Sequence, residues 1–93
     1  MSEDEEVKMR VTSPAALANA VRNQRKACQK TQRDTADLVG IKQTTVSDFE
    51  LKPESTKLET LFKILAALDL ELHVTARGVT INDNPDSANK REW

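Results

Sequence analysis

Several residue types are scarce in this chain of 93 residues, and each scarcity argues against a class of protein. Aromatic residues make up only 3% of the chain, which argues against a module that stacks RNA bases on aromatic side chains. A single Cys permits no intrachain disulfide and is typical of the reducing cytoplasm, where we expect the protein to act. With one His and no Cys/His cluster, the sequence predicts no metal site and no cofactor.

Long apolar runs are also missing. The longest falls far short of a membrane span, and the first residues are acidic where a signal peptide would be basic and then apolar, so we expect no membrane contact. We find no phosphate loop, no paired catalytic carboxylates and no nucleophile beside a base, so we expect neither an enzyme nor a small-molecule ligand. Helix formers dominate, with two Gly and three Pro, which predicts one small all-α domain.

Residues 31–50, TQRDTADLVGIKQTTVSDFE, carry the strongest pattern. Thr31 and Asp34 match a capping box that starts a helix, and Gly40 provides the backbone freedom needed at a helix end. A second helix would then begin with hydrogen-bonding side chains at 42–47 and keep an apolar face behind them. The pattern predicts a helix-turn-helix whose second helix enters a DNA groove.

Other local signals predict a helix on each side of this motif. Ser13 and Pro14 start one that runs to about residue 27, and Thr56 with Glu59 matches a second capping box. On the first helix we expect these residues to face inward: Leu17, Ala20, Val21 and either Ala27 or Cys28. On the last helix the expected core stripe is Leu58, Leu61, Phe62, Leu65 and Leu68.

The hydrophobic period changes from 3.6 to 2 after Asp69, which predicts a half-buried strand. Its inward positions are Leu70, Leu72, Val74 and Ala76. A lone strand cannot satisfy its own backbone, so it forms either a hairpin through Gly78 or a sheet with the same strand of a second subunit. We favour the homodimer, because operator-binding domains of this kind usually act as twofold dimers.

These signals give the expected organisation of the chain. We expect a disordered acidic arm at 1–12, a helix-turn-helix DNA-binding domain at 13–69, a dimerisation strand at 70–77 and a flexible tail at 78–93. The only Trp stands at the last position, Trp93, apart from any apolar pattern. It is either an incidental terminal residue or a side chain that fills a pocket of a partner protein.

Charge is unevenly distributed, although the net charge is only −1. Residues 21–57 contain eight basic and five acidic side chains, which gives +3, and each flank has −2. Because phosphate attraction acts over about 10 Å, a local patch of this size is able to assist DNA binding. Most such charges merely solvate helix faces, so the patch supports the helix-turn-helix prediction without carrying it.

The motif residues resemble the XRE family, the Cro/repressor type of helix-turn-helix, and within it the HipB-type antitoxins. The XRE motif covers about residues 13–69 and is carried by Thr31-Gln32, Ala36, Gly40-Ile41, Lys42-Gln43 and Thr45 to Glu50. The resemblance to HipB-type antitoxins is carried by GIKQTTVSDFE, TKLETLFKILAAL, the strand that follows and a final Glu92-Trp93. It implies a lambda-repressor-like bundle of four to five helices plus a short C-terminal strand that pairs in a dimer. Thr35 departs from the Leu usual in the family, which we expect to leave the core slightly underfilled.

The resemblance also implies roles for individual residues. The base-reading surface would be Lys42, Gln43, Thr44 and Ser47. The phosphate contacts would come from Gln32, Thr45, Thr56 and Lys57. Arg25 and Glu50 would form a largely buried structural ion pair, and Trp93 would bind the toxin.

We therefore expect an antitoxin of a type II toxin–antitoxin module that is also an autorepressor. As a homodimer it would bind an inverted-repeat, double-stranded DNA operator and neutralise a HipA-type serine/threonine kinase toxin. The alternative from the same residues is a stand-alone XRE-family transcriptional regulator whose tail contacts nothing.

Overall fold

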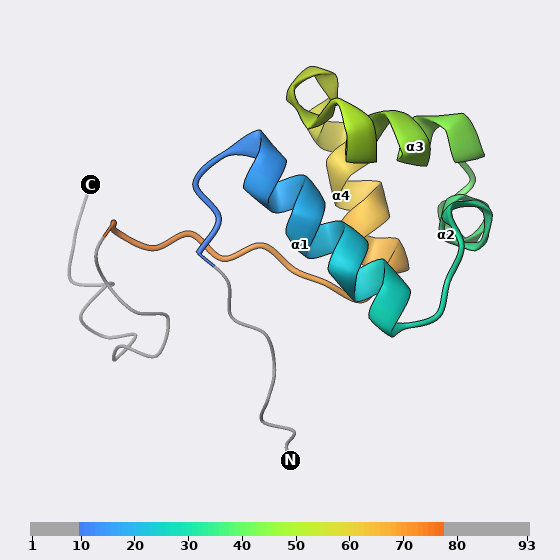
Figure 1. Ribbon diagram of the computed structural model, residues 1–93, viewed down its shortest axis with the longest axis horizontal. Coiled ribbons are helices and arrows are strands. Elements are labelled where there is room, and N and C mark those ends of the chain that lie inside the picture. Colours follow the sequence, from blue (N-terminus) through green and yellow to red (C-terminus); the bar gives the residue numbers. More distant parts are fainter. Residues whose placement is uncertain (1–9, 78–93) are drawn as a thin grey trace, which may run out of the picture. The chain divides into compact units, whose positions relative to one another are not determined.

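The computed structural model of the protein describes residues 10–77, so most of the expected arm and the whole tail with Trp93 lie outside the described residues. Residues 10–71 fold as one compact unit, and residues 72–77 belong to a second unit. The first unit contains α1 (Pro14–Ala27), α2 (Gln32–Val39), α3 (Gln43–Leu51), a 3-10 turn η2 (Pro53–Ser55) and α4 (Leu58–Ala67) (Figure 1). The predicted all-α helix-turn-helix bundle is confirmed, with four α-helices in the described part.

Two helices begin at the caps that the sequence predicts. The Ser13 hydroxyl accepts a hydrogen bond from the Ala16 backbone N–H at 3.1 Å, and Pro14 is the first residue of α1. At α2 the Thr31 hydroxyl accepts from the Asp34 N–H at 2.9 Å, and the Asp34 carboxylate accepts from the Thr31 N–H at 3.0 Å. This is a complete capping box. The bond from the Thr31 backbone also lowers the pKa of Asp34.

The second predicted capping box, Thr56 with Glu59, is wrong. The N-cap of α4 is Lys57, which makes no side-chain cap, and the helix begins at Leu58. Thr56 therefore stands one residue too early for its hydroxyl to reach the third backbone N–H of the helix.

Three helices are followed by a residue in the left-handed conformation: Gln29 at φ 59°, Gly40 at φ 70° and Asp69 at φ 61°. After α2, the Ile41 N–H donates to the Ala36 carbonyl at 3.1 Å, which closes the helix end in the manner of a Schellman motif. Gly40 is the only glycine among the three, and the conformation costs a residue with a Cβ atom roughly 1–2 kcal/mol.

We expect Gly40→Ala to lower the free energy of unfolding by about 1 kcal/mol through backbone strain alone, because no atom lies within 4 Å of the added Cβ. Gly40→Asn should cost less, since Asn tolerates the left-handed region better. Urea unfolding of the three proteins measures the difference. Equal losses for Ala and Asn would show that strain at this turn is not the cause.

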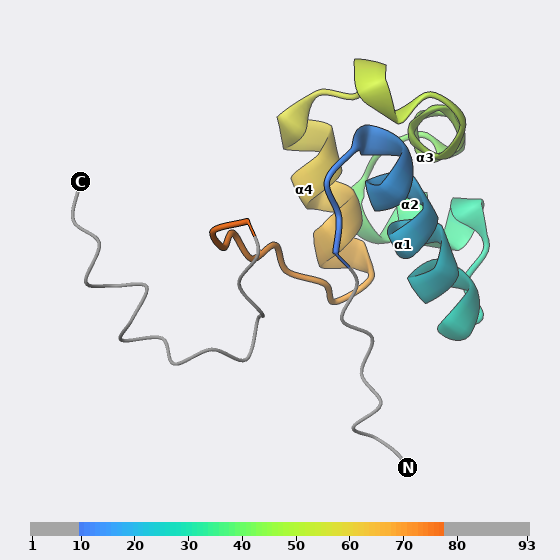
Figure 2. The ribbon, with the colours of Figure 1, turned by 60° about the vertical axis from the view of Figure 1, so that its left-hand side comes forward.

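The core of the helical unit draws on all four helices, and its buried apolar residues are Ala18, Val21, Ala36, Val46, Phe49, Leu61, Ile64, Leu65 and Leu68. Helix α2 packs against α3 and α4, while α1 packs against α3 and η2. Figure 2 shows this arrangement from a second direction. Burial on this scale in a small domain leaves only a modest margin of stability.

Two parts of the predicted core are wrong. On α4 the face toward the core runs through Leu61, Ile64, Leu65 and Leu68, which leaves Phe62 half exposed, about 100° around the helix from Leu61. Leu58, in the first turn, is 70% exposed. On α1 the buried face continues from Val21 to the half-buried Arg25, so Ala27 and Cys28 at the helix end are exposed.

The Thr35 hydroxyl is satisfied inside the core, while the expected underfilling at this position stays a prediction. Thr35 is fully buried, and its hydroxyl donates to the Thr31 carbonyl at 3.0 Å, one turn back along α2. In residues 10–77 no buried side-chain nitrogen or oxygen lacks a hydrogen-bond partner. The hydroxyl is thus accommodated within its own helix, as buried polar groups require.

The predicted strand is not formed within one chain: no β-strand occurs in residues 10–77. Leu70, expected at the dimer interface, is half-buried against its own core in the single chain, and its N–H closes the end of α4 by donating to the Leu65 carbonyl at 2.8 Å. Leu72, Val74 and Ala76 are exposed. Their pairing with a second subunit stays a prediction.

Candidate nucleic-acid interface

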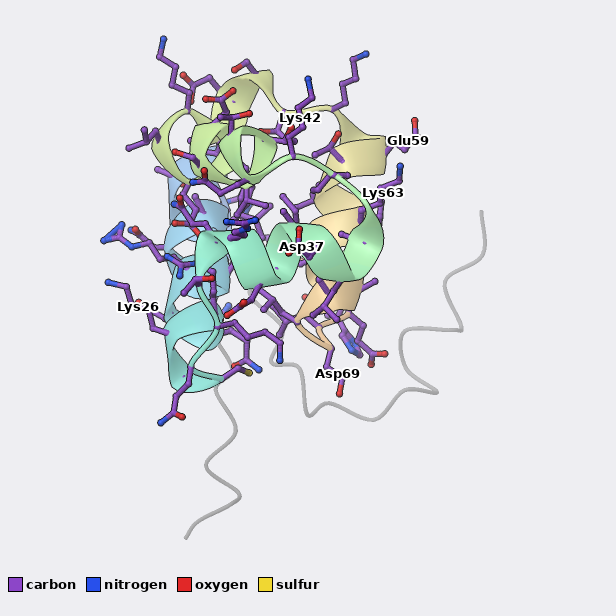
Figure 3. All side chains as sticks on the ribbon, turned by 90° about the vertical axis from the view of Figure 1, so that its right-hand side faces the viewer. Lys26, Asp37, Lys42, Glu59, Lys63 and Asp69 are labelled. Carbon is purple, nitrogen blue, oxygen red and sulfur yellow. The ribbon has the colours of Figure 1, made fainter. Side chains whose placement is uncertain are left out.

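The turn between α2 and α3 fixes how α3 leaves the core. Ile41 is partly buried against the core beside the left-handed Gly40, and Val46 and Phe49 bury the inner face of α3. The opposite face of the same helix is polar, as the sequence pattern predicts. Figure 3 places Lys42, at the start of α3, and Asp69, after α4, at opposite ends of the helical unit.

The four expected base-reading residues are brought together on the first part of α3. Lys42 is its N-cap and Gln43 its first residue, and Lys42, Gln43 and Thr44 are exposed while Ser47 is half-buried. Gln43 and Thr44 stand four and three positions before Ser47, so the three side chains lie over one edge of the helix. This edge carries two amide or ammonium groups and two hydroxyls, which are the groups that read base edges in a major groove.

The four expected phosphate residues lie in three places. Gln32 begins α2, Thr45 is in the first turn of α3, and Thr56 and Lys57 precede α4. Lys57 is exposed, and the other three are half-buried. The N-termini of α3 and α4 both lack a side-chain cap, and each has a lysine at the N-cap. Uncapped N–H groups beside a cation suit contacts to phosphate oxygens.

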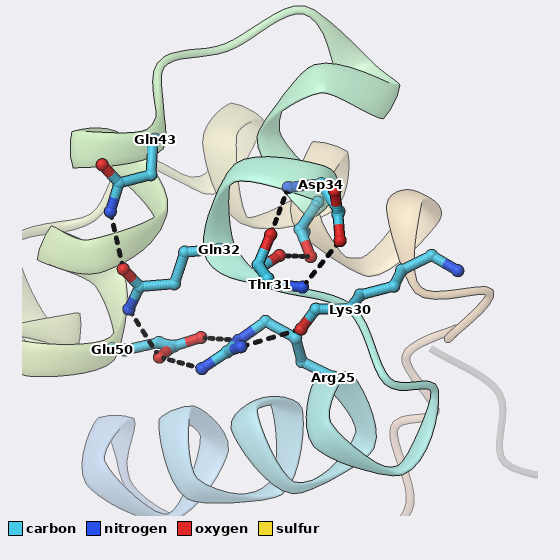
Figure 4. Close-up of polar contacts among 8 residues, drawn as sticks. Arg25, Lys30, Thr31, Gln32, Asp34, Gln43 and Glu50 are labelled. Carbon is cyan, nitrogen blue, oxygen red and sulfur yellow. Dashed lines mark hydrogen bonds and ion pairs between the residues drawn. The ribbon is translucent and has the colours of Figure 1, made fainter.

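Arg25 of α1 and Glu50 of α3 form a two-bonded ion pair inside the helical unit (Figure 4). Arg25 Nε donates to Glu50 Oε2 at 2.6 Å, and Arg25 Nη2 donates to Glu50 Oε1 at 3.0 Å. Only 11% of the Arg25 side chain and 5% of the Glu50 side chain are exposed. Arg25 Nη1 also donates to the Lys30 carbonyl at 2.9 Å, so the guanidinium ties the α1–α2 loop to α3.

Burial alone would raise the pKa of Glu50, because a carboxylate loses its hydration in the interior. The hydrogen bonds from Arg25 and Gln32, together with the positive charge of Arg25, outweigh that effect and lower the pKa below its ordinary value. Glu50 is therefore ionised at neutral pH.

Gln32 links this ion pair to the polar edge of α3, which sequence reasoning missed. Gln32 Nε2 donates to Glu50 Oε1 at 3.0 Å, and Gln43 Nε2 donates to Gln32 Oε1 at 2.7 Å. Gln32 and Gln43 are the first residues of α2 and α3, and only the crossing of the two helices brings them together. A glutamine at the start of both helices of the motif was the one available signal.

In residues 10–77 no group of three or more His, Cys, Asp or Glu side chains is arranged to hold a metal ion. No helix in that part of the chain is long and apolar enough to cross a membrane.

Comparison with known proteins identifies the family. The helix-turn-helix family matches residues 21–74. Antitoxin HipB from two Escherichia coli strains is 38% identical over 86 residues, covering 90% of this chain and 88% or 94% of the relative. Antitoxin HigA1 of Mycobacterium tuberculosis is also 38% identical, over 74% of this chain but only 46% of its own length.

Solved structures agree with the sequence relatives. A chain of a HipA–HipB–O2–O3 complex matches with a TM-score of 0.73 and 40% identity, covering 75% of this chain and 99% of that one. A HipB–O4 20mer complex matches with a TM-score of 0.74 over the same shares, again at 40% identity. The chain belongs to the XRE-type helix-turn-helix family and within it to the HipB-type antitoxins, which are not enzymes.

Proposed function

We propose that this protein is the antitoxin of a toxin–antitoxin module and represses its own operon. As a homodimer it binds an inverted-repeat operator with α3 in the major groove, and it binds and neutralises a HipA-type serine/threonine kinase. The observation that carries the proposal is the 38% identity to antitoxin HipB across 90% of the chain, combined with the exposed polar edge at the start of α3. Operator binding would place the protein in the cytoplasm with the chromosome.

Each base-reading residue is assigned a partner by its chemistry. Gln43 suits the N6/N7 edge of adenine, Lys42 the O6/N7 edge of guanine, and Thr44 and Ser47 accept or donate a single hydrogen bond. The Thr44 methyl also fits against a thymine methyl. A good two-bonded pairing contributes about 1–3 kcal/mol of discrimination between bases.

Phosphate contacts would set the register of the protein on DNA. We assign them to Gln32, Thr45, Thr56 and Lys57 together with the uncapped N-termini of α3 and α4. Gln32 still has one amide hydrogen to give, because Glu50 takes only one of its two donors. Binding through such contacts is independent of sequence and sensitive to salt.

The dimer and the toxin contact would come from the C-terminal part of the chain. Leu72, Val74 and Ala76 are exposed in the single chain, as expected of residues that a second copy would cover. Trp93, outside the described residues, is assigned to the kinase, because a large indole is typical of residues that dominate an interface.

Gln43→Ala is expected to relax operator specificity at one position in each half-site by about 1–3 kcal/mol, since a two-bonded base contact is lost. Lys57→Ala should weaken binding to all sequences alike and reduce the salt dependence by about one counterion, because it removes only a phosphate contact. Titration of the operator and of single-base variants at several salt concentrations separates the two effects. If Gln43→Ala left every base preference unchanged, α3 would not be the recognition helix.

Deleting Trp93 is expected to reduce co-purification with a HipA-type kinase while leaving operator affinity unchanged. Pull-down and DNA titration on the same preparations test both halves of the expectation. Undiminished co-purification would remove the role of the tail. Failure of the intact protein to bind the kinase at all would favour the stand-alone regulator, the second candidate function.

A further inference from the structure

We propose that the Glu50 carboxylate fixes which way round the side-chain amide of Gln43 points, so that Gln43 offers its carbonyl oxygen to a base that carries an exocyclic amino group. The inference rests on the proposed role of α3 as recognition helix. It adds a specificity-determining residue that lies in the interior and touches no DNA.

The hydrogen-bond network that leads to Gln43 begins at the Arg25–Glu50 ion pair, which is held in a fixed geometry. Two hydrogen bonds from Arg25 hold the Glu50 carboxylate in place. A carboxylate has only acceptor oxygens, so any group that bonds to it must be a donor. The part of the Gln32 amide that faces Glu50 is therefore its NH2 group, which donates at 3.0 Å.

Gln32 in turn fixes the orientation of the Gln43 amide. With its NH2 group toward Glu50, Gln32 turns its carbonyl oxygen to Gln43, and that oxygen requires a donor. Gln43 supplies its own NH2 group at 2.7 Å. Figure 4 shows the result: the Gln43 nitrogen points to Gln32, and the Gln43 oxygen points away from the network.

An isolated glutamine amide has no such preference, because its oxygen and nitrogen ends are nearly the same size. Here, turning the Gln43 amide over would set two carbonyl oxygens against each other. Turning both amides over would set the Gln32 carbonyl against the Glu50 carboxylate. The first alternative exchanges a hydrogen bond for a repulsion between two carbonyl oxygens. The second places an oxygen against a charged carboxylate at a part-buried contact, where the repulsion is poorly screened.

The orientation determines which base edge fits. Gln43 has an acceptor oxygen and one N–H left for DNA. Adenine offers the complement, an amino group at N6 and an acceptor at N7, and cytosine offers an amino group at N4. Guanine and thymine present acceptor oxygens there, which would oppose the Gln43 oxygen. The geometry therefore favours adenine at this position and disfavours guanine.

The test uses the full chain and a duplex selected by the wild-type protein from a random library. Gln43→Ala first identifies the base pair that Gln43 reads, and that pair is then varied to G·C, to T·A and to purine in place of adenine. Wild type should bind the adenine duplex about fivefold or more tighter than the guanine or purine duplex. Gln32→Met leaves the Arg25–Glu50 pair intact and removes the two hydrogen bonds that Gln32 makes, to Glu50 and with Gln43.

We expect Gln32→Met to lose most of the preference for the adenine duplex over the guanine duplex. Affinity for the guanine duplex should fall least, because the Gln43 amide, no longer held by Gln32, is able to turn over and donate to guanine. Glu50→Gln, whose amide both donates and accepts, should do the same where circular dichroism shows that it folds. Gln32→Met also removes a proposed phosphate contact, which lowers affinity for all four duplexes alike, so the readout is the ratio of the adenine to the guanine affinity. An unchanged ratio would overturn the inference. If Gln43→Ala relaxed no position, the recognition role itself would fail first.

Discussion

Replacing Glu50 with alanine is expected to lower the free energy of unfolding by about 3–5 kcal/mol, a large share of the stability of a domain this small. The reason is the charge that remains: Arg25 is only 11% exposed, and without Glu50 its guanidinium would keep a single bond, to the Lys30 carbonyl. The same change would leave the Gln32 amide without its acceptor. Urea unfolding at one fixed protein concentration measures the loss, since dimerisation makes stability concentration-dependent.

Glu59→Ala is the matched control, because Glu59 pairs with Lys63 at 3.9 Å on the surface, with side chains 80% and 47% exposed. Such a pair contributes about 0.5 kcal/mol or less. Equal shifts for the two alanine variants would contradict the buried-pair account.

The Glu50 contribution should also depend on pH in one direction. Because its pKa is lowered in the folded state, the stabilisation is present above the ordinary glutamate pKa of about 4.3 and is lost as pH falls through the lower folded-state value. Unfolding free energies of the wild type should therefore fall below pH 4, and those of Glu50→Gln should fall less. Parallel pH profiles for the two proteins would assign the acid sensitivity to other carboxylates.

Phe49→Ala is expected to cost about 3–5 kcal/mol, because Phe49 is 99% buried at the point where the inner face of α3 meets the core. Its loss would leave a cavity that the short helices cannot close without moving. In a domain of marginal stability this is enough to populate the unfolded state at room temperature. Thermal unfolding followed by circular dichroism measures the effect.

Phe62→Ala makes the same chemical change at a side chain that is half exposed on α4, so it should cost well under half as much. The comparison also tests the corrected core, since the helical spacing alone predicts that both rings are buried. A loss at Phe62 equal to that at Phe49 would mean that Phe62 is covered in solution, as it would be in a dimer interface.

Local rules were sufficient to predict the helices and their starts at Ser13 and Thr31, because capping depends on residues three positions apart. They were also sufficient for the turn at Gly40. They failed at the last helix, where Thr56 is the better capping residue by type but ends η2 instead, its N–H donating to the Pro53 carbonyl, and Lys57 becomes the N-cap. Periodicity likewise identified the stripe on α4 but not its rotation, which depends on where α2 lies against it.

The candidate site also contains features that the sequence predicts and features that it does not. The exposed edge from Lys42 to Ser47 follows from the polar run at the start of α3, and the resemblance to XRE proteins supplied the Arg25–Glu50 pair. The two hydrogen bonds of Gln32 could not be predicted from the sequence. They join residues 11 and 18 positions apart and require the crossing of α2 and α3. The alternating pattern also did not reveal that Leu70 packs partly against its own core at the end of α4, because that contact depends on how the chain leaves the helix.

The central claim is that the start of α3 lies in the major groove of DNA. An iron chelate attached to Lys42→Cys, in a Cys28→Ser background, tests it directly, with Lys26→Cys as the matched control, because Figure 3 shows Lys26 and Lys42 well apart and both lysines are exposed. With operator saturated by each protein, the label at position 42 should cut both strands within the half-site, and the label at position 26 should leave the half-site uncut. Cleavage in the half-site from position 26, with none from position 42, would contradict the account.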